Sequence, residues 1–141
     1  HRYLNKISGP LLDRIDIQLE VVPVPFKELS AMREGESSAV IRERVIKARK
    51  IQQERFKDYP EVHCNAQMNT QMMKEFCKIK PSGLELLKTI MEKLQLSARA
   101  YDRILKVSRT IADLEGFEDI QDSHLAEAIT YRSLDRESWG R

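Results

Sequence analysis

Two arginines stand where they could contact an anion. Arg14 follows the turn marked by Gly9-Pro10 and precedes a stretch with the pattern of a β-strand. Arg99 lies in the first turn of a predicted helix, two residues after the predicted N-cap Ser97. Arginine suits phosphate because its planar guanidinium can donate two parallel hydrogen bonds. These two positions are therefore the first candidates for a phosphate-contacting site.

The position of Arg99 has two interpretations. A cation at a helix N-terminus opposes the helix dipole, which is unfavourable by roughly 0.3–1 kcal/mol for an exposed side chain. A bound phosphate would remove that conflict, because the arginine and the free N–H groups of the first turn would both face an anion. The alternative is a surface arginine with Asp102 and Arg103 nearby, and the spacing alone favours this alternative.

One short β-strand is predicted over residues 15–22. Apolar and polar residues alternate there, with the apolar positions at Ile15, Ile17, Leu19 and Val21. Two prolines, Pro23 and Pro25, end the pattern because neither can donate a backbone hydrogen bond. A lone strand has no partner for its backbone groups. We therefore expect the chain to be a piece of a larger protein whose sheet contains this strand.

The longest predicted helix spans residues 38–57 and holds seven basic residues against two acidic ones. Its apolar side is formed by Val40, Ile41, Val45, Ala48, Ile51 and Phe56. The basic residues opposite that side are Arg42, Arg49, Lys50 and Lys57. A solvated face is the favoured interpretation of these four, and contact with DNA is the alternative, since phosphate neutralisation needs such a stripe. Arg44 and Arg55 fall among the apolar positions, so we expect each to pair with a carboxylate or to lie at an interface.

Further helices are predicted over residues 70–77, 81–94, 97–115 and 122–134. Helix 97–115 has a polar side that consists of Arg99, Asp102, Arg103, Lys106, Arg109, Thr110 and Asp113. Four long helices with short connectors predict a mainly α fold class, a four- to five-helix bundle preceded by the one short β-strand.

Helices 81–94 and 97–115 can also be interpreted as a helix-turn-helix with Arg99, Arg103 and Lys106 facing DNA. The chain would then be a stand-alone nucleic-acid-binding module. Asp102 and Asp113 interrupt that face, and the predicted strand has no role in such a module.

Composition narrows the remaining classes. With 141 residues, 41% hydrophobic and 33% charged, the chain is long enough for one globular domain with a core. A net charge of +2 does not indicate nucleic acid by itself. No apolar run reaches membrane-spanning length, so no membrane partner is expected, and we expect a cytoplasmic protein. Cys64 and Cys77 lack zinc-site spacing and are expected to be reduced thiols, and no metal site is expected.

Two long stretches resemble bacterial magnesium-chelatase-like AAA+ ATPases. These are the competence-related relatives of the magnesium chelatase ATPase subunit and of the minichromosome-maintenance helicases. The stretches are residues 6–17 (KISGPLLDRIDI) and residues 97–114 (SARAYDRILKVSRTIADL). Residues 124–132 are also similar, whereas residues 24–80 match only loosely.

The resemblance implies a division of the chain. Residues 1–24 would be the end of an AAA+ core, residues 25–135 the α-helical C-terminal lid domain, and residues 136–141 a flexible tail. By match to the family pattern, Arg14 would be the arginine finger, acting in trans on a neighbouring subunit's ATP, and Arg99 the sensor 2 arginine. The Walker A lysine and Walker B carboxylate of the family are not found in this chain. ATP and magnesium are therefore expected as cofactors of the full-length protein only, and this part of an ATP hydrolase is expected to be inactive alone.

The resemblance also implies partners and work. The expected partners are the chain's own upstream ATPase core, further copies in a ring, expected to be a hexamer, and DNA. The implied work is remodelling of DNA by helicase-like motion, for which the basic helix 38–57 gives weak independent support. An ATPase subunit for metal insertion into a tetrapyrrole is a further alternative.

Overall fold

The computed structural model describes residues 7–31 and 34–132. The described residues form seven α-helices and one short 3-10 helix. In chain order these are α1 (Gly9–Leu12), α2 (Phe26–Ser30), α3 (Ser38–Arg55), η2 (Asn65–Gln67), α4 (Thr70–Phe76), α5 (Pro81–Lys93), α6 (Ala98–Glu115) and α7 (Asp122–Thr130). The prediction of a mainly α fold is confirmed, and the predicted tail 136–141 lies outside the described residues.

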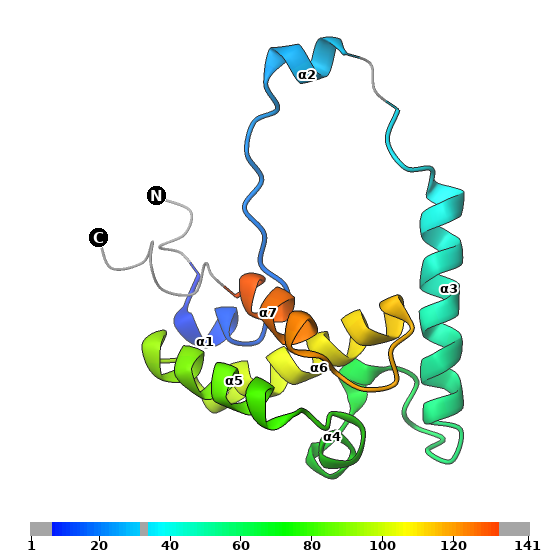
Figure 1. Cartoon of the computed structure of the whole chain (residues 1–141), viewed down its shortest axis with the longest axis vertical. Helices are drawn as coiled ribbons and strands as arrows, with labels where there is room; N and C mark the ends of the chain where they lie inside the picture. The colour runs from blue at the N-terminus through cyan, green and yellow to red at the C-terminus, as the bar shows by residue number, and fades with distance from the viewer. Residues whose placement is uncertain (1–6, 32–33, 133–141) are drawn as a thin grey trace.

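Helix α6 is the centre of the bundle (Figure 1). Helix α7 makes its most extensive contacts with α6, α5 packs on α7, and α3, η2 and α4 each pack on α6. The core side chains Ile104, Ala112 and Leu125 are fully buried in these contacts. Burial of such side chains supplies the main favourable free energy of the bundle.

The ends of α6 follow the sequence closely. The Ser97 hydroxyl accepts a hydrogen bond from the Ala100 N–H at 3.2 Å, so Ser97 caps the helix as predicted. Gly116 ends the helix with φ at 76°, in the left-handed region that favours glycine. Local capping thus fixes where this helix begins and ends.

The predicted strand over residues 15–22 is wrong: none of the described residues lies in a strand. Residues 17–25 run without regular structure along the bundle and away from it to α2 (Figure 1). The alternating apolar side chains face solvent, with Leu19 66% and Val21 89% exposed. A strand needs a neighbouring strand along its length, and among the described residues this segment has only an isolated backbone bond, from the Gln18 N–H to the Tyr131 carbonyl.

Helix α3 packs on the bundle only through its C-terminal half, and its N-terminal half projects beyond it (Figure 1). Of the predicted apolar side, Ala48 and Phe56 are buried, whereas Val40, Ile41 and Val45 are 50%, 41% and 42% exposed. The periodicity of the sequence therefore marks one side of α3 correctly, but only the part next to α6 is covered.

A buried polar network joins α3 to α6. The carboxylate of Asp113 is fully buried and accepts hydrogen bonds from the Arg55 guanidinium on both oxygens. The Asn65 side-chain amide donates to Asp113 at 2.8 Å, and its oxygen accepts from Arg55 at 2.8 Å. The Gln52 side chain in turn accepts from the Asn65 N–H at 2.9 Å. These bonds fix the helical turn at η2 between the two long helices.

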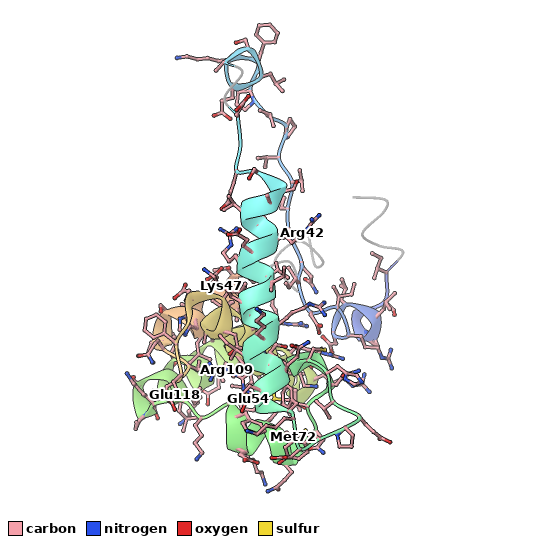
Figure 2. All side chains as sticks on the ribbon, turned by 90° about the vertical axis from the view of Figure 1, so that its right-hand side faces the viewer. Arg42, Lys47, Glu54, Met72, Arg109 and Glu118 are labelled. Carbon is pink, nitrogen blue, oxygen red and sulfur yellow. The ribbon has the colours of Figure 1, made fainter. Side chains whose placement is uncertain are left out.

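Arg109 extends the network to the end of α6. It forms an ion pair with Asp113 at 3.2 Å and donates to the carbonyls of Phe117 and Glu118, each at 2.7 Å. Figure 2 shows Arg109 and Glu118 side by side below the projecting part of α3. Burial lowers the pKa of Arg109, and the Asp113 carboxylate acts in the opposite direction. The helical wheel put Arg109 and Asp113 on the polar side of α6, but it did not show that both are buried by the segments that close over this side.

The expectation for Arg44 and Arg55 is confirmed. Arg55 forms an ion pair with the buried Asp113, and Arg44 forms an exposed, bidentate ion pair with Glu36. The Arg44 guanidinium lowers the pKa of the Glu36 carboxyl by hydrogen bonding.

None of the helices described here is long and apolar enough to cross a membrane.

We predict that Asp113→Ala strongly destabilises the bundle. The substitution leaves the guanidiniums of Arg55 and Arg109 without their carboxylate in a buried site, which is expected to lower the free energy of unfolding by about 3–5 kcal/mol. Urea denaturation followed by circular dichroism measures this loss. The matched control is Glu36→Ala, which breaks the exposed pair with Arg44 and should leave the urea midpoint nearly unchanged. Equal effects of the two substitutions would contradict the central role of Asp113.

We also predict that the two thiols react at very different rates. Burial raises the pKa of Cys77 to about 11, so roughly one in a thousand of these thiols is ionised at pH 8. Cys64 is only partly buried. Iodoacetamide labelling of the folded protein at pH 8 should modify Cys64 first, whereas both thiols should react together in urea. Labelling of both at the same rate in the native state would show that Cys77 is not enclosed.

Candidate functional site

The turn that carries Arg14 is a single helical turn followed by a bend. Pro10 lies at the start of α1, where its fixed φ suits a helix, and Asp13 is the C-cap. The Arg14 N–H donates to the Leu11 carbonyl at 3.1 Å, which closes the turn. The Arg14 side chain is exposed and makes one long hydrogen bond, to the Pro10 carbonyl at 3.4 Å. Most of its N–H donors are thus available to an anion.

Arg99 is the second residue of α6. Its side chain is exposed and forms no hydrogen bond or ion pair with the described part of the chain. The dipole of this long helix places partial positive charge at the same end. The combination of a free guanidinium and a helix N-terminus can accept a phosphate, which is the interpretation that the spacing alone did not favour.

The structure brings the two arginine-bearing turns together. The Ser97 hydroxyl donates a hydrogen bond to the Asp13 carboxylate at 3.1 Å, across 84 positions of sequence. Asp13 directly precedes Arg14, and Ser97 lies two residues before Arg99. The same Ser97 hydroxyl caps α6, so one side chain organises the start of the helix and holds the turn. The two turns that carry the candidate arginines are therefore in direct contact.

Three further contacts hold the segment after Arg14 against α6 and α7. Asp16 forms an ion pair with Arg103 of α6 at 3.0 Å. The buried Arg132 guanidinium donates to the Ile15 carbonyl at 2.8 Å, and the Gln18 N–H donates to the Tyr131 carbonyl at 2.8 Å. The sequence analysis did not single out Asp13, Asp16 or Arg132. The only local indication in the sequence is that one acidic residue lies on each side of Arg14, Asp13 directly before it and Asp16 two positions after it.

These contacts weigh against the helix-turn-helix alternative. Arg103 is engaged with Asp16, and Lys106 donates to the Ala66 carbonyl at 3.0 Å. Helix α5 packs mainly on α7, so α5 and α6 do not form the closely packed pair that a helix-turn-helix needs. Two of the three residues predicted to meet DNA are thus engaged by the chain's own segments, and of the three only Arg99 is exposed.

The four basic residues of the longest helix lie away from the two arginine-bearing turns. Arg42, Arg49, Lys50 and Lys57 are all exposed. Lys57, just beyond α3, pairs with Glu54 at 2.5 Å. Arg42 and Lys47 lie on the projecting part of α3 (Figure 2). Helices α1 and α3 lie on opposite sides of the bundle in Figure 1, so the structure does not bring the basic helix and the two arginines together.

A shallow hollow of about 300 Å³ lies beside the lower part of this basic helix. Arg49 and Lys57 line it together with Tyr59 and His63. Cations beside an aromatic ring are a combination that nucleic-acid-binding surfaces use. No group of three or more His, Cys, Asp and Glu is arranged to hold a metal ion in residues 7–31 and 34–132.

Comparison with known proteins identifies relatives along the whole chain. The family model described as magnesium chelatase, subunit ChlI C-terminal, matches residues 35–132, and that of magnesium chelatase, subunit ChlI, matches residues 1–29. The competence protein ComM of Haemophilus influenzae is 46% identical over 136 residues, and the uncharacterized protein YifB of Escherichia coli is 40% identical over 136 residues. Each alignment covers 96% of this chain and 26% of the relative, so the chain spans about a quarter of their length.

These matches confirm the resemblance to magnesium-chelatase-like, competence-related proteins. The family models together cover both arginine-bearing turns, residues 1–29 around Arg14 and residues 35–132 around Arg99. The chain belongs to the magnesium chelatase subunit ChlI family, and residues 35–132 are its C-terminal region.

Proposed function

We propose that this chain is the C-terminal lid portion of a ring-forming AAA+ ATPase, with Arg14 as the arginine finger and Arg99 as the sensor 2 arginine. The observation that carries the proposal is the hydrogen bond between Asp13 and Ser97, which joins the two turns that carry the exposed Arg14 and Arg99. The family of the chain supports a nucleotide as the anion that these turns meet.

Each arginine has a defined task in the proposal. Arg14 donates from its guanidinium fork to the γ-phosphate of ATP bound to a neighbouring subunit, where negative charge spreads over the oxygens in the transition state. Arg99 contacts a phosphate oxygen with the N-terminus of α6 behind it, where the helix dipole adds to its charge. Magnesium and ATP are held by an ATPase core that the lid works with, and the chain alone does not turn over ATP.

The division of the chain that the family resemblance implies is also the one that we propose. Residues 1–24 close the ATPase core, and residues 25–135 form the lid, in a protein that assembles as a hexameric ring in the cytoplasm. The exposed apolar residues Ile17, Leu19 and Val21 support this division, because contact with the ATPase core would remove their side chains from water.

The work that we propose for the ring is the remodelling of DNA. The exposed cations Arg42, Arg49 and Lys50 support it, because none of them has a carboxylate partner in the described part of the chain. Lys57 contributes less, since Glu54 already neutralises it. Arg42 and Arg49 are seven residues apart and so lie on one side of α3 about two turns apart, a spacing that can follow a phosphate backbone.

We predict that Arg14→Ala and Arg99→Ala each abolish most ATP turnover in the full-length protein. An arginine finger contributes about 10³–10⁵ in kcat, so the Arg14 variant should lose at least about a thousandfold. A phosphate-release assay on the assembled ring measures the loss. Arg14→Lys retains the charge but not the planar guanidinium, so its ATP turnover should lie between that of wild type and that of Arg14→Ala. The control Arg44→Ala, which removes an arginine of similar exposure, should keep turnover within about twofold. Turnover near wild type in both Arg14→Ala and Arg99→Ala would refute the ATPase role.

We predict that the triple variant Arg42→Ala, Arg49→Ala, Lys50→Ala weakens DNA binding by the full-length protein. A plot of log affinity against log salt has a negative slope for duplex DNA, and each lost phosphate contact makes this slope less steep by about 0.9. Fluorescence anisotropy from 50 to 200 mM salt, a range over which such contacts respond strongly, measures the slope. The matched control removes three exposed lysines from other helices, Lys74, Lys88 and Lys93, and so changes the net charge equally. An identical loss in the two triple variants would show that net charge, and not the α3 face, attracts DNA.

A further inference from the structure

The position of Arg14 is fixed by contacts that its neighbours in the sequence make, and not by contacts of its own side chain. Its guanidinium makes one long hydrogen bond to the Pro10 carbonyl at 3.4 Å, within the same turn. On either side of it, Asp13 binds Ser97 and Asp16 binds Arg103. Both partners lie on the first two turns of α6, the helix that carries Arg99. Two of the contacts that place Arg14 relative to Arg99 are therefore side-chain contacts with the N-terminal end of α6 itself.

We propose that Asp13, Asp16 and Arg103 are positioning residues that hold Arg14 and Arg99 as one unit. This inference rests on the proposed function, and it assigns to these residues a task that is separate from the contacts with nucleotide. Asp13, the residue before Arg14, is hydrogen-bonded to Ser97, the N-cap of α6. Asp16, two residues after Arg14, forms an ion pair with Arg103. The Ile15 backbone between them is fixed by the buried Arg132. A turn held at both ends cannot move without α6, so a movement of Arg99 with its helix carries Arg14 along.

The chemistry of the two anchors suits positioning better than stability. The side chains of Arg103 and Asp16 are 31% and 43% exposed, and their 3.0 Å contact is an ion pair without the alignment of a hydrogen bond. Partly exposed single ion pairs of this kind contribute less to the free energy of folding than the fully buried Asp113 network. The Asp113 network, not these anchors, holds α3, η2 and the end of α6 together. Removal of the anchors should loosen the turn from α6, while the backbone contacts of Ile15 and Gln18 keep the segment on the bundle and leave the fold intact.

Misplacement of a reacting or stabilising group by about 1 Å can lower a rate by about a hundredfold. A contact made only in the transition state affects kcat and not KM. Release of the Arg14 turn is therefore expected to lower kcat while ATP binding is retained. A merely structural role would instead lower the thermal midpoint.

The test is a charge swap in the full-length protein. Arg103→Asp and Asp16→Arg each place like charges together, and each should lower kcat for ATP hydrolysis by about ten- to a hundredfold with KM within about twofold. The double variant Asp16→Arg, Arg103→Asp restores opposite charges and should recover kcat to within a few-fold of wild type. All three should melt within a few degrees of wild type. The control Arg44→Asp creates a like-charge pair with Glu36 far from the turn and should leave kcat and KM unchanged.

A second pair of variants tests the other anchor without reversing a charge. Asp13→Asn keeps a side-chain oxygen that can accept the Ser97 hydroxyl and should retain kcat, whereas Asp13→Ala should lower it about tenfold. Wild-type kcat in Arg103→Asp, Asp16→Arg and Asp13→Ala, in a protein in which Arg14→Ala is inactive, would overturn the positioning role and leave the proposed function standing. A double variant no better than the single ones would overturn the pairing of Asp16 with Arg103. If Arg14→Ala itself retains turnover, the proposed function fails first.

Discussion

The bundle depends on one buried carboxylate. Asp113 is fully enclosed and is satisfied by Arg55 from α3, Asn65 from η2 and Arg109 from its own helix. A carboxylate without these partners would be strongly unfavourable in such a site, so the positions of three segments are set by its need for hydrogen bonds. Arg109 then passes the constraint to the carbonyls of Phe117 and Glu118, which positions the turn into α7. Apolar packing stabilises the bundle, and this network specifies how its helices meet.

The two ends of α6 have different tasks as a result. Its C-terminal half carries Asp113 and Arg109 and is held rigidly in the core. Its N-terminal turns carry Ser97, Arg99 and Arg103, which are partly or largely exposed and meet the segment around Arg14. A rigid helix with a lightly anchored surface at one end can transmit a rotation of the bundle to the two arginines. In the proposed ATPase this would connect the lid to the phosphate-contacting surface.

The local features of the sequence predicted the helices well. The Ser97 cap, the Gly116 stop and the apolar period of α6 act within a few residues, and the structure confirms all three. The prediction of a strand over residues 15–22 was wrong because alternation shows only that a segment has one apolar and one polar face. It does not show the neighbouring strand that a strand requires. The apolar side of α3 was only half buried for a related reason: periodicity says which side is apolar but not how far the neighbouring helix extends.

The sequence by itself determined helices α3 to α7, the family and the identities of Arg14 and Arg99 as candidates, because each of these depends on short stretches of adjacent residues. Only the tertiary structure decided that Asp113 and Arg109 are buried, that Asp13 meets Ser97 and that Asp16 meets Arg103. The partners in the last two contacts are more than 80 positions apart, and charged side chains on a helical wheel look alike whether they face solvent or a carboxylate brought in from elsewhere. The physical reason is that pairing between charges is a property of distance in space, which the order of residues along the chain does not contain.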